Sequence, residues 1–263
     1  MLIFFIYNVC LGVAVINVLP IKPLDGGFMT ETLTNKKFAN AVSLIFFAIE
    51  FAILIIVVLL NRDHPYFWTT IALLALLQLY QLSEFLICSG IAPAIFIRIG
   101  YVIITFLPPT GYFLSSQISG WKNKSNILGK DYILGFILGL GFAIYYLVDT
   151  ASVTLLDCNP FYATYDSKYS LAYGIYYYGY IMFGIALLFY SIGFGVYKEQ
   201  NYPNKKYAIL ILIGYLSFLV PMHLMTLIDV SWLKVVPSVM CKYAILLAIN
   251  LGVFSFIKKS KTE

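Results

Sequence analysis

Long apolar stretches recur along almost the whole chain, and they constrain its fold more than any other feature. A helix needs roughly 20 apolar residues to cross the core of a bilayer. Segments of that length and character lie near residues 2–20, 40–60, 67–87, 92–116, 131–150, 172–197, 207–228 and 233–257. The sequence therefore predicts an all-α, polytopic transmembrane helix bundle of about eight spans, the first of them broken at Pro20–Gly26.

The composition excludes a water-soluble globule. Hydrophobic residues make up 61% of the 263 positions and charged residues 11%, whereas a soluble domain carries about 25% charged residues. The net charge of +5 does not indicate nucleic acid, because the lysines lie in short loops between apolar runs and form no stripe or arm. The partner that the composition predicts is the lipid bilayer.

Basic residues gather on one side of an eight-span count, and they predict the orientation. These residues are Lys122, Lys124, Lys130, Lys198, Lys205, Lys206, Lys258, Lys259 and Lys261. Cytoplasmic loops carry an excess of Lys and Arg, so we expect a multi-pass protein of the cell membrane with both termini in the cytoplasm. Lys36 and Lys37 then fall outside, which conflicts with the rule for that one loop.

A pattern with chemical content ends the first span. It reads N-x-x-P-x-x-x-L-D-G, and a chance match in a chain of this length is on the order of one in ten thousand. Its fixed positions are Asn17, Pro20, Leu24, Asp25 and Gly26, with Gly27 directly after them. Proline breaks a helix, and a break within lipid must face protein or a wet cavity. Asp25 would there be an oxygen ligand or a hydrogen-bonded carboxylate, unless the segment is only an interfacial turn.

The pattern resembles the third-ligand motif of the site-2 protease family, the intramembrane zinc metalloproteases. The resemblance covers residues 1–60 and implies that Asp25 is a zinc ligand on a broken transmembrane helix. It divides the chain into a partial protease-like segment of two spans, residues 1–60, and a six-span bundle, residues 61–263. It also implies that this chain is an incomplete or non-catalytic relative.

A zinc protease of this kind needs H-E-x-x-H, which supplies two zinc ligands and a general base. The two histidines of the chain, His64 and His223, have no adjacent Glu and no second His at the required spacing. No catalytic residue is therefore assigned, and we expect no peptidase activity from this chain alone. Zinc would be bound only if a separate chain carrying H-E-x-x-H supplied the missing ligands.

Ionisable residues inside apolar spans usually mark partners or pathways. Glu50 lies in the middle of its span, and Gln78, Gln81 and Glu84 share one helix face. Arg98 lies about as far after the short turn as Glu84 lies before it, so the two residues are expected at the same depth in the membrane. We therefore predict an ion pair between Glu84 and Arg98.

A polar pocket on the outer side is the second candidate site. Glu84, Arg98, Asp149 and His223 all fall near the outer ends of their spans, and a histidine in such a pocket can titrate or bind a metal. Three cysteines fall on the same side, and an oxidising compartment would allow two of them to pair. These are Cys88, Cys158 and Cys241. The sequence does not indicate which two.

The aromatic composition has a simpler interpretation. The tyrosines of one helix, Tyr176, Tyr177, Tyr178 and Tyr180, are interpreted as part of an interfacial aromatic belt.

Residues 67–257 resemble polytopic membrane proteins of prokaryotes without an assigned function, and also the multi-span sensory modules at the front of some histidine kinases. The segments that carry this likeness are Glu84-Phe85-Leu86, Pro108-Pro109, Cys158-Asn159-Pro160-Phe161 and Pro237-Ser238-Val239-Met240-Cys241. Two alternatives to a protease relative therefore stay open: a membrane sensor or ligand-binding module, and a small-solute transporter, for which one broken helix is weak support.

Overall fold

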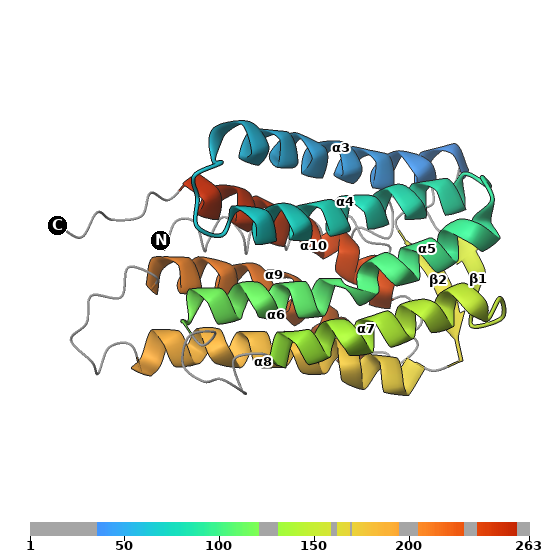
Figure 1. The fold of residues 1–263 in the computed structure, drawn as a ribbon. Helices are drawn as coiled ribbons and strands as arrows, with labels where there is room; N and C mark the ends of the chain where they lie inside the picture. The colour runs from blue at the N-terminus through green and yellow to red at the C-terminus, as the bar shows by residue number, and fades with distance from the viewer. Residues whose placement is uncertain are drawn as a thin grey trace.

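The computed structural model describes residues 36–120, 131–158, 162–168, 170–194, 205–228 and 236–256. Its elements, in chain order, are α3 (Lys36–Leu60), α4 (Phe67–Cys88), α5 (Pro93–Thr105), α6 (Leu107–Ile118), α7 (Asp131–Val148), β1 (Val153–Cys158), β2 (Ala163–Ser167), α8 (Ser170–Phe194), α9 (Lys205–Ile228) and α10 (Val236–Phe256). The helices run side by side along one direction, and the two strands lie at one end of the bundle, here called the hairpin end (Figure 1).

Seven helical segments within the described residues are long and apolar enough to cross a bilayer. They are Val42–Leu60, Phe67–Cys88, Pro93–Ile118, Asp131–Val148, Leu171–Gly193, Lys205–Leu224 and Val236–Phe256. These correspond to the last seven of the predicted spans, so the prediction of an all-α polytopic bundle is confirmed. The first predicted span, near 2–20, and its break at Pro20–Gly26 lie outside the described residues.

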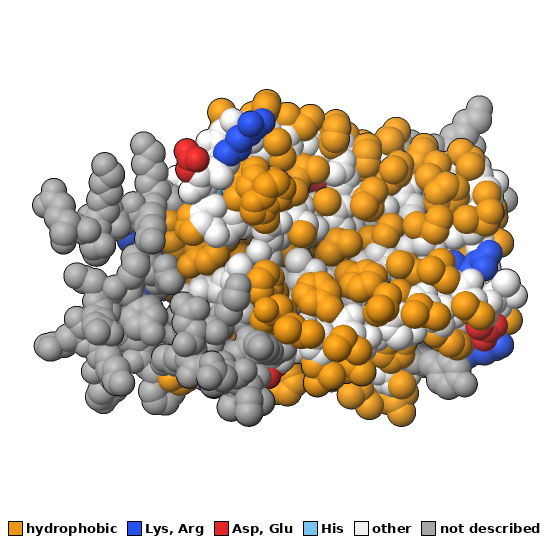
Figure 2. Space-filling model, in the orientation of Figure 1, with side chains coloured by type: hydrophobic (Ala, Val, Ile, Leu, Met, Phe, Trp, Pro, Cys, Tyr) orange, Lys and Arg blue, Asp and Glu red, His pale blue; other side chains and the backbone are white. Residues whose placement is uncertain are grey.

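The outer surface of the bundle is apolar where lipid would contact it. Large hydrophobic side chains such as Trp68, Leu171 and Phe183 are exposed, and Figure 2 shows hydrophobic side chains covering the face between the two ends, with charged side chains near the ends. A soluble monomer rarely exposes a contiguous apolar surface of this extent. The chain is therefore an integral membrane protein.

The interior is organised around α10, most of whose residues are buried. α3 packs against both α4 and α10, so residues 36–60 lie directly on the helices that follow. The division of the chain at residue 60 stays a prediction.

One membrane span consists of two helices. α5 ends at Thr105, and α6 begins at Leu107 with Pro108 and Pro109 in its first turn. Proline has no N–H to donate, and its ring clashes with the preceding turn of a helix. The two prolines therefore end α5. The first turn of a new helix tolerates proline, so α6 can begin there.

The longest polar loop contains a β-hairpin that the sequence analysis did not predict. β1 and β2 pair in antiparallel orientation, with Cys158 opposite Ala163 at the turn and an irregularity in register between Leu155 and Asp157. Val153 and Tyr165 are buried against the bundle. The hairpin is thus packed on the helix ends.

The interpretation of the α8 tyrosines as an interfacial belt is wrong for Tyr176, which is buried inside the bundle. It belongs to a continuous row of six rings, with centroids 5.5 to 6.2 Å apart between successive members. The row is Tyr165, Tyr101, Tyr173, Tyr176, Tyr180 and Tyr112. Tilted and edge-on aromatic contacts of this kind stabilise a core beyond the area that they bury.

Close packing of α7 against this row gives a prediction at one glycine. A Cβ at Gly139 would lie 2.6 Å from the Tyr176 hydroxyl, which is held by hydrogen bonds to the carbonyl oxygens of Thr105 and Gly135. We expect Gly139→Ala to lower the unfolding free energy by about 1–3 kcal/mol, measured by detergent titration in mixed micelles. Gly141→Ala is the matched control, since no atom of the other described helices lies within 4 Å of its new Cβ; equal effects of the two substitutions would contradict the packing.

Candidate functional site

A buried lysine connects three helices inside the bundle. The Nζ atom of Lys242, on α10, lies 2.9 Å from Glu84 Oε1, and it donates to Ser43 Oγ at 2.7 Å and to Gln81 Oε1 at 2.8 Å. An ammonium group has three N–H donors, and each of them has an acceptor here. Ser43, Gln81, Glu84 and Lys242 are called the Lys242 cluster below.

The cluster contains further bonds that hold its members in place. Gln81 Nε2 donates to the carbonyl oxygen of Cys241 at 2.7 Å, and Ser43 Oγ lies 3.4 Å from Glu84 Oε1. Gln81 and Glu84 reach the same ammonium because residues three apart share one helix face. Gln81 and Glu84 therefore share the face of α4 that was predicted to be polar, and they contact α3 and α10 there.

Both charged members of the pair are removed from solvent. The side chains of Glu84 and Lys242 are each 2% exposed. Transfer of two charges out of water costs several kcal/mol per ion, and only close geometry with additional hydrogen bonds offsets that cost. Ionisable groups in such a position within a membrane span are a functional-site hypothesis by default.

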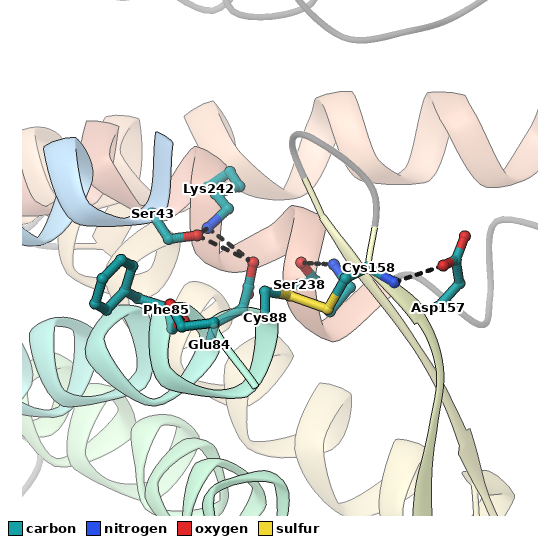
Figure 3. The surroundings of a disulfide bond; sticks show 10 residues. Ser43, Glu84, Phe85, Cys88, Asp157, Cys158, Ser238 and Lys242 are labelled. Atoms are coloured by element: carbon teal, nitrogen blue, oxygen red, sulfur yellow. Dashed lines mark hydrogen bonds and ion pairs between the residues drawn. A yellow bond between two sulfur atoms is a disulfide. The ribbon is translucent and has the colours of Figure 1, made fainter. Parts of the chain in front are cut away.

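The β-hairpin is attached to both helices that carry the ion pair. Cys158, at the end of β1, forms a disulfide with Cys88, one helical turn after Glu84. The Ala163 N–H, at the start of β2, donates to Ser238 Oγ at 2.9 Å, one turn before Lys242. Figure 3 shows the disulfide, the Ser238 bond and the ion pair side by side. The end of β1 and the start of β2 therefore bridge α4 and α10 next to the Lys242 cluster.

The disulfide resolves which of the three cysteines on this side pair. Cys88 and Cys158 are bonded, and Cys241 is a free, buried thiol. Buried free cysteine behaves mainly as a small apolar side chain.

The predicted ion pair between Glu84 and Arg98 is wrong. Arg98 is bonded to backbone carbonyl oxygens, with Nε donating to Ala94 and Nη1 to Leu147. The depth estimate did not take rotation about the helix axis into account. α4 meets α5 through Ser83, which contacts Gly100, and the next residue along an α-helix is rotated by about 100°. Glu84 therefore faces α3 and α10.

The other two members of the predicted pocket also have partners of their own. Asp149 forms an exposed salt bridge with Lys168 at 3.7 Å; the N–H of Ala151, which donates to it, and the Lys168 charge lower the pKa of this carboxyl. His223 Nδ1 lies 2.9 Å from the Leu219 carbonyl oxygen, and its ring contacts Tyr178. These contacts give no support to a pocket shared by the four residues.

The protease-like motif lies outside the described residues, and with it Asp25, the predicted metal ligand. Within the part of the chain that the structure describes, no group of three or more His, Cys, Asp or Glu side chains could hold a metal ion.

The bundle contains a small cavity that cannot serve as a ligand pocket. Its volume is about 30 Å³, and its lining includes Leu77, Tyr177, Tyr215, Phe218 and Met240. A water molecule needs roughly 10–15 Å³ of such volume and several polar partners. The space would hold about two waters and has mainly apolar walls.

Sequence reasoning did not identify Lys242 as a member of the site. The signal was available, because Lys242 is a cation inside the apolar run 233–257. The rule that selected Glu84, that ionisable residues within spans are costly and usually paired, applies equally to it.

Comparison of the whole chain with protein-family models, with curated proteins and with solved structures finds no match.

Proposed function

We propose that this chain is a membrane sensor or ligand-binding module whose β-hairpin is the input element. One observation carries the proposal: the hairpin is attached to α4 beside Glu84 and to α10 beside Lys242. A displacement of the hairpin would therefore act on both partners of a buried ion pair. Switching proteins work in this way: a local change in charge or packing shifts the balance between two arrangements of the helices.

The proposed orientation places the hairpin outside the cell. Disulfides persist in oxidising compartments and are rare in the cytosol, which supports an external position for Cys88 and Cys158. The opposite end carries Lys205 and Lys206 at the start of α9, which the positive-inside rule assigns to the cytoplasm. Lys36 begins α3 at the hairpin end, so the conflict at Lys36 and Lys37 remains.

The proposal predicts that loosening the hairpin exposes the interior next to the ion pair. In a Cys10→Ser background, Ser238→Ala would leave the buried Ala163 N–H without its acceptor, at a cost of about 1–3 kcal/mol. We expect alkylation of Cys241 by N-ethylmaleimide in intact liposomes to become about tenfold faster, since 1.4 kcal/mol corresponds to a factor of ten. Cys88→Ser with Cys158→Ser should act in the same direction.

Ser89→Ala is the matched control, because the Ser89 hydroxyl lies at the same end of α4 and donates to Phe85 within its own helix. It should leave the alkylation rate unchanged. The proposal is overturned if releasing the hairpin speeds amide exchange in residues 153–167 and leaves Cys241 as unreactive as before.

A second function rests on a separate observation, the N-x-x-P-x-x-x-L-D-G pattern. We propose that residues 1–60 derive from a site-2 protease and that Asp25 can complete a zinc site when another chain carrying H-E-x-x-H supplies the remaining ligands. This protease ancestry is compatible with a sensory role for the bundle, since the ancestry concerns residues 1–60 and the sensory role concerns the hairpin and the ion pair between Glu84 and Lys242.

The zinc content of the purified complex tests this second proposal directly. The purified chain, co-expressed with a candidate partner that contains H-E-x-x-H, should retain zinc, and Asp25→Ala should release it. Asp63→Ala, in the loop between α3 and α4, is the control. Equal zinc in the complexes of wild type and Asp25→Ala would exclude Asp25 as a ligand.

A further inference from the structure

Glu50 is a second buried carboxylate close to the Lys242 cluster. It lies on α3 seven residues after Ser43, which places it about 10 Å deeper along the same helix face. Its side chain is 0% exposed, and neither carboxylate oxygen has a hydrogen-bond partner among the described residues. Phe46, one turn before it, contacts the Lys242 ammonium at 5.8 Å from the ring centroid.

The charges around Glu50 do not balance if every group is ionised. The titratable groups that interact electrostatically with it are Lys242 and Cys241 on α10, and Glu84 on α4 interacts with both of these in turn. Lys242 is one cation, and Glu84 already contacts it at 2.9 Å. A second ionised carboxylate here would be an uncompensated charge in an apolar interior, which proteins avoid by neutralising the group. One further positive charge is therefore needed at this site.

A proton fits that requirement better than a metal cation. Hard cations bind several oxygen ligands at once, and the side chains that follow Glu50 on its face, Ile53 and Val57, are apolar. The Glu84 atom that lacks a partner among the described residues, Oε2, can also accept a proton.

We propose that Glu50 and Glu84 form a single-proton site inside the membrane, with Lys242 compensating whichever carboxylate is ionised. In the arrangement seen here Lys242 pairs with Glu84, and Glu50 holds the proton. Because the two carboxylates lie at different depths, transfer of that proton from one to the other moves charge along the bundle axis. The site is thus a proton-binding device in contact with the same ion pair that the hairpin flanks.

Infrared spectroscopy of the full chain in lipid nanodiscs tests the proposal, since a protonated carboxyl group has a C=O band that shifts in D₂O. At neutral pH the wild type should have such a band, and Glu50→Gln should remove it. Glu84→Gln should also remove it, because Lys242 is then free to compensate an ionised Glu50. Lys242→Met should double its intensity, because both carboxylates must then be protonated.

Two results overturn the proposal. A wild-type band that survives Glu50→Gln would assign the proton to another group, and a band that survives Glu84→Gln would exclude a proton shared through Lys242. Asp149→Asn, at the exposed salt bridge with Lys168, is the control and should leave the band unchanged. These outcomes do not depend on the hairpin, so the sensory proposal can fail while this one holds.

Discussion

Lys242→Met is expected to lower the free energy of unfolding by about 3 kcal/mol, because it leaves the Glu84 carboxylate buried without its counter-charge. Methionine retains most of the length of the lysine side chain, so the substitution removes the charge and the three N–H donors and creates little empty volume. The value is at the lower end of the usual range for breaking a buried pair, since Glu84 can reduce the cost by taking up a proton. Detergent titration in mixed micelles at pH 8 measures it.

A double-mutant cycle separates the pair from its surroundings. Lys242→Met combined with Glu84→Gln should cost about 2 kcal/mol less than the sum of the single substitutions, which is within the range for residues in direct contact. Arg98→Leu is the reference substitution, since Arg98 donates to backbone oxygens. Its effect should add to that of Glu84→Gln. Coupling between Glu84 and Arg98, with additivity between Glu84 and Lys242, would refute the assignment.

Removal of the Cys88–Cys158 disulfide is expected to have the second large effect, a loss of about 2–4 kcal/mol. The bond closes a segment with a sequence separation of 70, and a cross-link over a long segment restricts the unfolded chain most. The helices of an unfolded membrane protein remain partly ordered, which places the effect below the value for a fully unfolded chain. The unfolding midpoint of Cys88→Ser with Cys158→Ser, compared with wild type, gives the loss.

The state of the thiols must be established in the same samples. Under denaturing conditions, reduction should add two maleimide–polyethylene glycol tags per wild-type chain, and the double substitution should abolish that increment. An unreduced wild type that already accepts all four tags would show that Cys88 and Cys158 are free in the cell.

The membrane spans were predictable because they depend on length and apolarity alone. The seven spans in the described part of the chain follow from runs of roughly 20 apolar residues, and no knowledge of neighbours was needed. The β-hairpin was harder to predict, since its strands are short, six residues in β1 and five in β2. Such strands gain their stability from packing on the helix ends.

The partner of Glu84 could not be obtained from depth alone. Arg98 and Lys242 both lie near the hairpin end of their helices, and depth does not distinguish them. Rotation about the axis of α4 decides between them, because Ser83 faces α5 while Glu84 and Gln81 face Lys242. That rotation becomes known only when the order of helices around α4 is known, and this order depends on contacts between distant parts of the chain.

The cysteine pairing illustrates the same limit. Cys88, Cys158 and Cys241 were correctly placed toward one side, but their pairing depends on the hairpin turning back over the end of α4. Cys241 faces the interior, and its backbone carbonyl oxygen accepts a hydrogen bond from Gln81. The next residue is Lys242, whose ammonium group links α10 to α3 and α4.

Chemical cross-linking of introduced cysteines tests the central claim most directly, namely that Glu84 and Lys242 meet inside the bundle beneath the hairpin. In a chain lacking Cys10 and Cys241, a short bifunctional thiol reagent should link Glu84→Cys to Lys242→Cys and should not link Glu84→Cys to Arg98→Cys. Peptide mapping identifies the linked pair. Linkage of positions 84 and 98, with none between 84 and 242, would contradict the account.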